Sequence, residues 1–215
     1  MKQKRIFTTS FIILTILSLF LLGGCQKKAK EPEEVVDEYL KKIQQKPYTI
    51  TDSISSMNRE YREQIEDLIK EFEYEIHETR DTENGEKCVL VTFTGYNIGA
   101  YFCQYLENYQ TDVQQLLEQD HTWAELEAMR MKKPEEYKEL FKTADLEVFT
   151  KYMNECREAG KTHHTEKGKS GVFVWKSEKT KEWEINLLGS GYYLDWITNG
   201  VYTDFQNYKK SVSED

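Results

Sequence analysis

The side chains best suited to chemistry in this 215-residue chain are its four cysteines and four histidines. His163 and His164 stand together beside Glu166. With His121 or Cys156 added, this group could be imagined around a metal ion. A zinc site, however, needs four ligands, and neighbouring side chains on a strand point to opposite faces of the sheet. We therefore expect no metal site and no other cofactor.

Three of the cysteines, Cys88, Cys103 and Cys156, have separations that match no metal-binding or redox motif. We expect all three to be small buried apolar side chains. The alternative is one disulfide with one thiol left over, because an odd number cannot pair completely. No phosphate-binding glycine loop, nucleophile elbow or Ser-His-Asp context accompanies them. The sequence thus predicts a protein that is not an enzyme.

The fourth cysteine, Cys25, follows a segment with the three parts of an export signal. A basic start is followed by the mainly apolar residues 6–22, and the small residues Gly23 and Gly24 lie directly before the cysteine. An uncleaved membrane helix is the competing interpretation, because this apolar run is close to the roughly 20 residues that cross a bilayer. The cysteine distinguishes the two interpretations.

Leu22-Gly23-Gly24-Cys25 resembles the bacterial lipobox. That resemblance implies that the Cys25 thiol receives a diacylglyceryl group and that a peptidase then cuts between Gly24 and Cys25. Two acyl chains hold a protein stably on a bilayer, where one chain would not. We therefore expect a lipid-anchored protein of the cell membrane that faces the extracytoplasmic side.

The remaining length is sufficient for one domain with a hydrophobic core. We expect the following division: residues 1–24 a signal peptide, 25–31 a lipidated tether, 32–208 a single α+β domain and 209–215 a polar tail. The formal net charge is −9, and no cluster of cations is present that could contact phosphates. Nucleic acid is therefore excluded as a partner. The expected partners are the membrane, through the group on Cys25, and a protein.

Hydrophobic periodicity predicts helices and strands in separate blocks, as in an α+β domain. Helices are expected over residues 32–45, 52–69, 98–117, from Thr122 onward, and over 134–142, 145–160 and 192–202. Strands are expected over residues 72–78, 88–96, 170–178 and 181–188. Asn84-Gly85 predicts the turn that joins the first two strands into an antiparallel hairpin.

This order of elements, with "EPEEVVDEYLKKI" after the lipobox and "EWEINLL" before "YLDWITNGV", is similar to that of small lipoproteins of Gram-positive bacteria. Their outer domain is NTF2-like or cystatin-like. The resemblance implies a curved antiparallel sheet packed on N-terminal helices, here with a helical insert between the strand pairs. Members of this kind mostly lack an assigned activity, so the resemblance implies a fold and a location rather than a reaction.

Aromatic side chains are the remaining candidates for a binding surface, because tyrosine and tryptophan offer large contact area with a polar tip. The candidate ligand or partner surface comprises Tyr74, Phe93, Tyr101, Tyr105, Tyr109, Trp183, Tyr192, Tyr193 and Trp196. An extended surface of this kind would recognise a protein. Alternatively, a closed pocket lined by Tyr74, Phe93 and Trp183 would hold a small ligand or a glycan. The simplest interpretation is that these rings complete the core.

Overall fold

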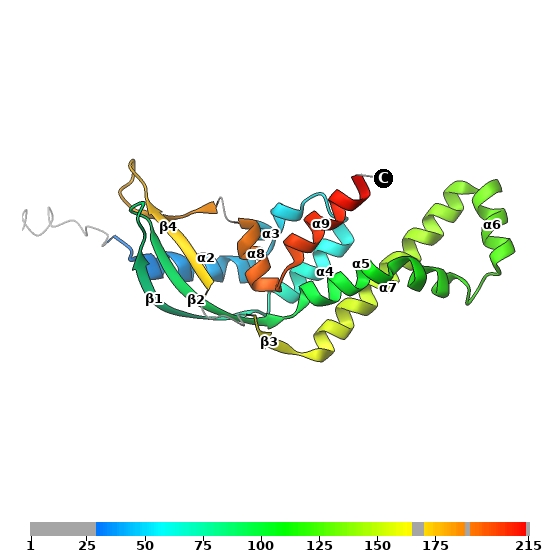
Figure 1. The fold of residues 1–215 in the computed structure, drawn as a ribbon, viewed down its shortest axis with the longest axis horizontal. Coiled ribbons are helices and arrows are strands. Elements are labelled where there is room, and N and C mark those ends of the chain that lie inside the picture. Colours follow the sequence, from blue (N-terminus) through cyan, green and yellow to red (C-terminus); the bar gives the residue numbers. More distant parts are fainter. Residues whose placement is uncertain (1–28, 165–169, 188–189, 214–215) are drawn as a thin grey trace, which may run out of the picture. The chain divides into compact units, whose positions relative to one another are not determined.

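A computed structural model describes residues 29–164, 170–187 and 190–213. Residues Pro32–Asp215 belong to one compact unit, and Met1–Glu31 belong to another. Within the described residues the first of these units is an α+β domain with eight α-helices and a five-stranded antiparallel sheet (Figure 1). The expected α+β class is therefore confirmed.

The helices and strands follow one another in an order that places a helical insert between two groups of strands. The first group is α2 (Pro32–Gln45), α3 (Tyr48–Thr51), the short 3₁₀ helix η1 (Asp52–Ile54), α4 (Arg59–Ile69), β1 (Glu73–Asp81) and β2 (Lys87–Tyr96). The insert is α5 (Ile98–Leu117), α6 (Trp123–Lys132) and α7 (Pro134–Ala159). The last group is β3 (Lys161–His163), β4 (Ser170–Lys176), β5 (Trp183–Ile185), α8 (Ser190–Thr198) and α9 (Val201–Ser213).

Strand β2 is the centre of the sheet. It pairs with β1 on one side, and on the other side with β4 along its first half and β3 along its second half. β5 extends the sheet beyond β4. The expected hairpin of β1 and β2 is confirmed, with a register that opposes Tyr74 to Phe93. Gly85 has φ of +77° in its turn, a conformation that glycine adopts without steric cost.

Helix α2 covers one face of the sheet and contacts β1, β2, β4 and β5. Val36, Leu40 and Ile43 are buried on the helix, and Val89, Val91 and Val174 are buried on the strands. Pro32 suits the first turn of the helix because it has no N–H to leave unpaired there, and Glu33 and Glu34 suit the positive end of the helix dipole. The apolar stripe and the end signals read from the sequence therefore match the buried face and the start of α2.

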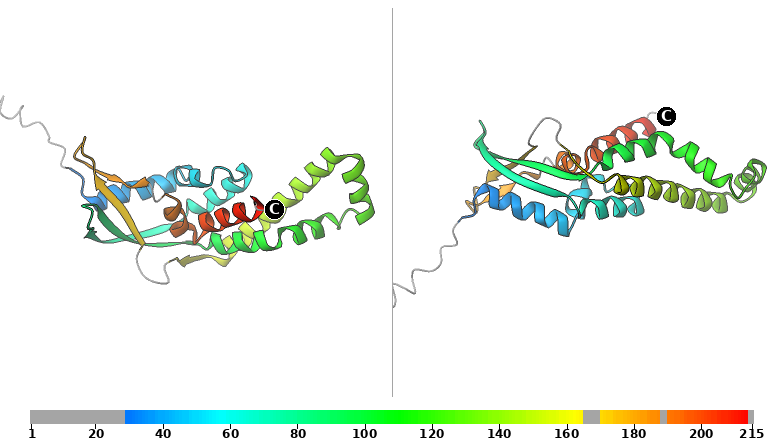
Figure 2. Two further views of the ribbon diagram at one scale, coloured as in Figure 1. Left: turned by 45° about the horizontal axis from the view of Figure 1, so that its top comes forward. Right: turned by 90° about the horizontal axis from the view of Figure 1, so that it is seen from below.

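Helices α5, α6 and α7 form an arm on the side of the domain away from the sheet (Figure 2). α7 returns past α5 and contacts it, and the two helices separate toward the end of the arm, where α6 joins them (Figure 2). Thr122 and Glu125 form the expected capping box at the start of α6, with side-chain to backbone hydrogen bonds in both directions. The arm is continuous with the core through Phe102, Phe149 and Tyr152.

The single helix expected over residues 52–69 is wrong. α3 and η1 end at Ile54, an irregular turn follows, and α4 begins at Arg59. Asn58 is the N-cap of α4, and its side chain accepts a hydrogen bond of 3.0 Å from the Glu60 N–H. This cap satisfies an N–H that has no partner within the helix. The long helix therefore begins after Asn58 and not at Asp52.

Two other boundaries differ from expectation. The helices expected over 134–142 and 145–160 are one continuous helix, α7, because nothing between them breaks a helix. The single final helix is instead α8 and α9, which are separated by Asn199 (φ +60°) and Gly200 (φ +116°). α9 reaches Ser213, so part of the segment that we expected as a polar tail is helical.

Candidate functional site

The lipid-anchor residues Gly24 and Cys25 lie outside the described residues. In the described part of the chain, no helix combines the length and the apolar character needed to cross a bilayer.

The histidine pair has structural partners. The His163 ring lies 2.8 Å from the Thr94 hydroxyl. The two His164 ring nitrogens lie 2.8 Å from the Gly95 carbonyl oxygen and 3.1 Å from that of Trp196. A Cβ on Gly95 would approach the His164 ring to 3.1 Å, so glycine is what allows the ring to lie there. His164 thus ties the end of β2 to α8. Among the described residues, no three His, Cys, Asp or Glu side chains are grouped to hold a metal ion.

The three described cysteines are free thiols rather than a disulfide and a leftover. Cys156 is fully buried, and Cys88 and Cys103 are half-buried. Burial raises the pKa of the Cys156 thiol to about 12. A thiol with so high a pKa stays protonated at neutral pH and is a poor nucleophile.

The nine aromatic residues proposed as a surface are dispersed. Phe93, Tyr105 and Tyr193 are buried, at 1%, 5% and 3% exposed. Tyr192 is 64% exposed. The others, Tyr74, Tyr101, Tyr109, Trp183 and Trp196, are half-buried. Two close pairs form within the set, Tyr105 with Tyr109 and Tyr193 with Trp196, with ring centroids 5.9 and 5.2 Å apart.

Two of these side chains make hydrogen bonds that hold elements of the fold together, and the sequence does not reveal these bonds. The Tyr193 hydroxyl accepts a hydrogen bond from the Phe173 N–H at 3.3 Å and donates one to the Asn186 carbonyl at 3.0 Å. It thereby joins β4 to the end of β5, where the strand ladder stops. Tyr74 donates to Asp37 on α2 at 2.8 Å, and this bond fixes the helix to the edge strand.

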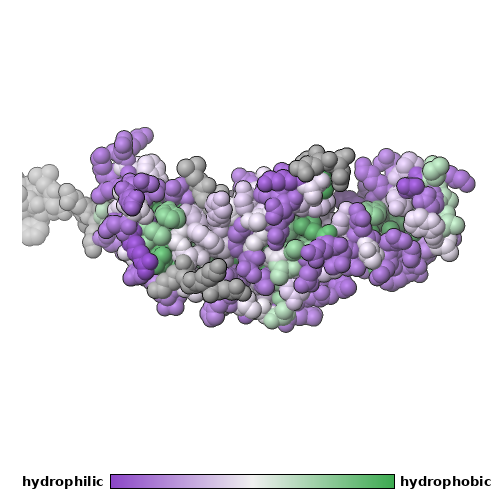
Figure 3. All heavy atoms as spheres, viewed as in Figure 1, coloured by the Kyte–Doolittle hydropathy of each residue, from purple (hydrophilic) through white to green (hydrophobic). Residues whose placement is uncertain are grey.

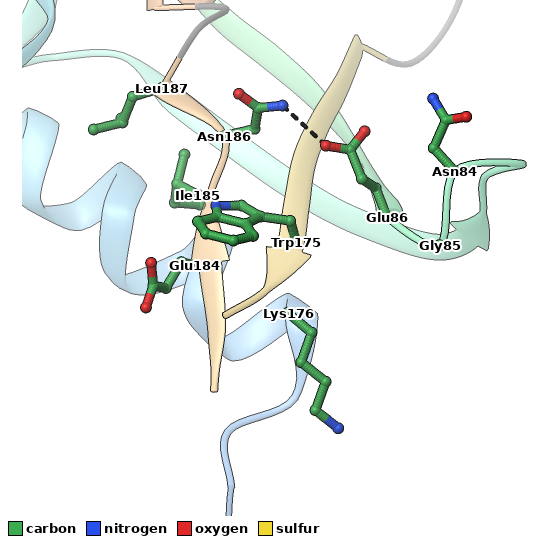
Figure 4. A pocket seen from close by; sticks show the side chains of 9 residues that line it. All are labelled: Asn84, Gly85, Glu86, Trp175, Lys176, Glu184, Ile185, Asn186 and Leu187. Atoms are coloured by element: carbon green, nitrogen blue, oxygen red, sulfur yellow. Dashed lines mark hydrogen bonds between the residues drawn. The ribbon is translucent and has the colours of Figure 1, made fainter. Parts of the chain in front are cut away.

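A first hollow, which we call the hairpin hollow, lies between the β1–β2 turn and the β4–β5 hairpin (Figure 4). Its volume is about 780 Å³, and it is open to solvent. It is lined by Asn84, Gly85, Glu86, Trp175, Lys176, Glu184, Ile185, Asn186 and Leu187. Trp175 is 40% exposed and Leu187 is 59% exposed, so apolar area remains in contact with water here.

Polar groups of the hairpin hollow come from both turns. Asn186 donates a hydrogen bond of 3.1 Å to Glu86, which links the residue after β5 to the β1–β2 turn. On the neighbouring face, the Lys87 and Lys176 ammonium groups lie 5.8 and 5.6 Å from the centroid of the Trp183 ring. Both cations are therefore close enough for a favourable interaction with the electron-rich Trp183 ring.

A second hollow, which we call the tyrosine cavity, lies among the helices and has a volume of about 210 Å³. Its lining comprises Ser56, Met57, Asn58, Tyr61, Phe102, Tyr105, Leu106, Tyr109, Asp145, Phe205 and Tyr208. The Asp145 carboxylate accepts hydrogen bonds from the Tyr61 hydroxyl and, at 2.8 Å, from the Tyr105 hydroxyl. Burial, and then the hydrogen bond to Asp145, raise the pKa of Tyr61 above its ordinary value.

None of the α8 aromatics lines the tyrosine cavity, whose lining includes Phe205 and Tyr208 of α9. Trp175 and Asp145 were missed by the sequence analysis. The alternation of buried Val172 and Val174 with more exposed neighbours could have indicated Trp175. No local signal indicates Asp145, because its partners are 84 and 40 residues away along the chain.

Comparison of the chain with protein-family models, curated proteins and solved structures finds no match.

Proposed function

We propose that this protein is a lipid-anchored, extracytoplasmic accessory module of the cell envelope that recognises a protein partner. The observation that carries the proposal is the exposed apolar area around the hairpin hollow, where Trp175, Leu187 and Phe173 are 40%, 59% and 36% exposed. Exposed aromatic and apolar side chains in one place, surrounded by polar groups, are typical of protein-recognition surfaces.

Polar residues surround the small apolar areas on one face of the molecule (Figure 3). On the face drawn in Figure 3, hydrophilic residues predominate and apolar residues gather in small areas, including one over the sheet. The hairpin hollow is also flanked by both signs of charge, from Glu184 and Lys176. A partner with a shallow apolar projection and a mixed polar rim would complement it.

The fold assignment within this proposal is NTF2-like or cystatin-like. It is supported by the resemblance in element order and by the position of α2 against the sheet. In a domain of this kind the concave face of the sheet could hold a ligand, but here the rings of Phe72, Tyr74 and Phe93 pack together. The Phe72 ring centroid lies 5.8 Å from that of Tyr74 and 6.0 Å from that of Phe93. This packing favours recognition on the outside of the domain over a ligand held inside it.

The anchor is tested by Cys25→Ala. We expect the variant to be released into the medium or to accumulate as an uncut precursor, because no thiol is present to accept the diacylglyceryl group. Cys103→Ala is the matched control, since it removes a thiol from α5 and leaves the lipobox intact. Normal processing and membrane retention of Cys25→Ala would refute the anchor.

The partner surface is tested by photo-cross-linking on intact cells. A cross-linking amino acid at Leu187 should capture one discrete protein, and the same amino acid at Trp123 on α6, which is 58% exposed, should not. Trp175→Ala should weaken the capture at Leu187. Equal capture at both positions, or capture that Trp175→Ala leaves unchanged, would contradict the proposal.

The second candidate function is binding of a glycan at the same place. It is favoured because the exposed Trp175 ring lines the same hollow as the amides of Asn84 and Asn186 and the carboxylate of Glu86 (Figure 4). Rings and hydrogen-bonding groups together suit a sugar face and its hydroxyls. Thermal unfolding against cell-wall sugars distinguishes the two functions, because a ligand at 100 times its Kd stabilises by about 2.7 kcal/mol. Trp175→Ala should abolish that shift.

A further inference from the structure

The tyrosine cavity holds a negative charge among aromatic rings. Of the described residues that line it, only Asp145 carries a formal charge. Both carboxylate oxygens face donors, one from Tyr61 and one from Tyr105. An ionised carboxylate accepts at about four positions, so these two hydrogen bonds leave it able to bind a further donor or cation.

The rings of the lining are packed around this carboxylate. The Tyr105 centroid lies 6.0 Å from that of Tyr61, 6.3 Å from that of Phe102 and 5.9 Å from that of Tyr109. Phe205 and Tyr208 on α9 complete the aromatic part of the lining. Aromatic faces attract cations within about 6 Å of the ring centroid, and more strongly where water is excluded.

Tyr105 and Tyr208 remain uncharged at neutral pH. Burial, and then interaction with Tyr61, raise the pKa of Tyr105 above its ordinary value. Burial, and then the neighbouring Tyr109, raise the pKa of Tyr208. Neutral phenols add no second negative charge, so Asp145 is the charged group among the described residues of the lining.

The rim of the cavity already attracts an ammonium group. The Lys209 side chain lies over Phe205, with its nitrogen 5.8 Å from the ring centroid, and donates a hydrogen bond of 3.2 Å to Ser56. Both Phe205 and Ser56 belong to the lining. The lysine thus occupies one cation position at the mouth, and it competes with any cation that enters.

From these observations we propose that the tyrosine cavity binds a small organic ammonium group, of the trimethylammonium or alkylammonium class. Asp145 neutralises its charge, and the rings of Tyr61, Tyr105, Tyr109 and Tyr208 surround its methyl or methylene groups. The volume of about 210 Å³ is below the roughly 300–1,000 Å³ of sites for drug-sized molecules, so it suits a headgroup rather than a large ligand. This site is separate from the hairpin hollow, and it does not depend on the function proposed above.

The experiment is titration calorimetry on the full chain in a choline-free detergent. Choline is the probe, and 3,3-dimethylbutan-1-ol, which has the same shape without the charge, is its matched control. We expect choline to bind at least about tenfold more tightly than the alcohol. Equal affinity for the two, or no detectable binding of choline, would overturn the proposal.

Variants assign the binding to this cavity. Asp145→Asn should lower the affinity for choline at least about tenfold, whereas Asp112→Asn should leave it unchanged. Asp112 is a matched control because it accepts a comparable hydrogen bond of 2.8 Å, from Tyr152, between the same two helices. Equal loss in both variants would overturn the assignment. Circular dichroism confirms that each variant is folded.

Two further variants keep the proposal falsifiable if Asp145→Asn fails to fold. Lys209→Gln removes the competing ammonium and should tighten binding of choline, whereas weaker binding would contradict the proposed competition. Tyr109→Leu should weaken binding more than Tyr109→Phe, because phenylalanine retains the ring. The source of the ligand is distinguished by glycerophosphocholine: binding comparable to that of choline supports a lipid headgroup, and weaker binding supports a free cation.

Discussion

Replacement of Gly99 by alanine tests how the insert is attached to the C-terminal helices. Gly99 lies in the first turn of α5 and is buried. A Cβ at this position would lie 2.1 Å from the Asn199 carbonyl oxygen and 3.0 Å from the Gly200 nitrogen. Ordinary contacts begin at 3.4 Å, so the first of these approaches is 3.4 − 2.1 = 1.3 Å too close. Both neighbours are backbone atoms of the α8–α9 turn.

The turn cannot easily move away. Asn199 donates a hydrogen bond of 2.6 Å to Asn97, the N-cap residue of α5. On its other side, Asp195 accepts hydrogen bonds of 2.7 and 3.1 Å from the Tyr202 and Thr203 N–H groups at the start of α9. Relief of the clash therefore separates α5 from α8 and α9 or distorts this turn.

The magnitude follows from two opposing terms. Overpacking against a fixed backbone costs about 3 kcal/mol, the upper part of the usual range. Alanine is favoured over glycine inside a helix by about 1 kcal/mol. We expect Gly99→Ala to lower the free energy of unfolding by about 2 kcal/mol, which for a domain of this size lowers Tm by about 4–8 °C.

The assay is urea and thermal unfolding of residues 26–215, followed by circular dichroism. Ala100→Gly, at the next helical position, is the control and should cost only about 1 kcal/mol through helix propensity. If propensity alone decided the outcome, Gly99→Ala would be stabilising. A Gly99→Ala variant as stable as the wild type would refute the reasoning.

Three further predictions follow from the buried thiol and phenols. Cys156 should react with iodoacetamide at pH 8 far more slowly than Cys103, and at a comparable rate only after unfolding; mass spectrometry of the alkylated chain measures both. Tyr193→Phe should lower the free energy of unfolding by about 1–3 kcal/mol, because a part-buried N–H and a part-buried carbonyl lose their partner. Tyr192→Phe on the exposed side of α8 should change it by less than about 0.5 kcal/mol. Tyr61 and Tyr105 have pKa values raised above the ordinary 10, so at high pH the folded chain keeps protons that the unfolded chain releases. With respect to these two groups, the free energy of unfolding should be constant below pH 10 and should fall as the pH rises above 10. Absorbance at 295 nm should show that these phenols ionise together with unfolding.

The sequence determined those elements whose signals are local. Pro32 with the apolar stripe of α2, the Thr122–Glu125 capping box and the Asn84-Gly85 turn each act within a few residues. Their energetic effects are therefore present in the chain before it folds. The α+β class also follows from local signals, because the hydrophobic period changes between the blocks of helix and the blocks of strand.

Tertiary packing determines which of two possible helix boundaries is used. It also determines which side chains that are distant in sequence come into contact. Asn58 prevails over Asp52 as a helix start, and Asn199-Gly200 divides the last helix at the point where it contacts Gly99. Asp145 accepts hydrogen bonds from Tyr61 and Tyr105, which approach it only when α4, α5 and α7 pack together. Hydrogen bonds of this kind depend on distances in space rather than along the chain. They cannot be predicted from residue spacing.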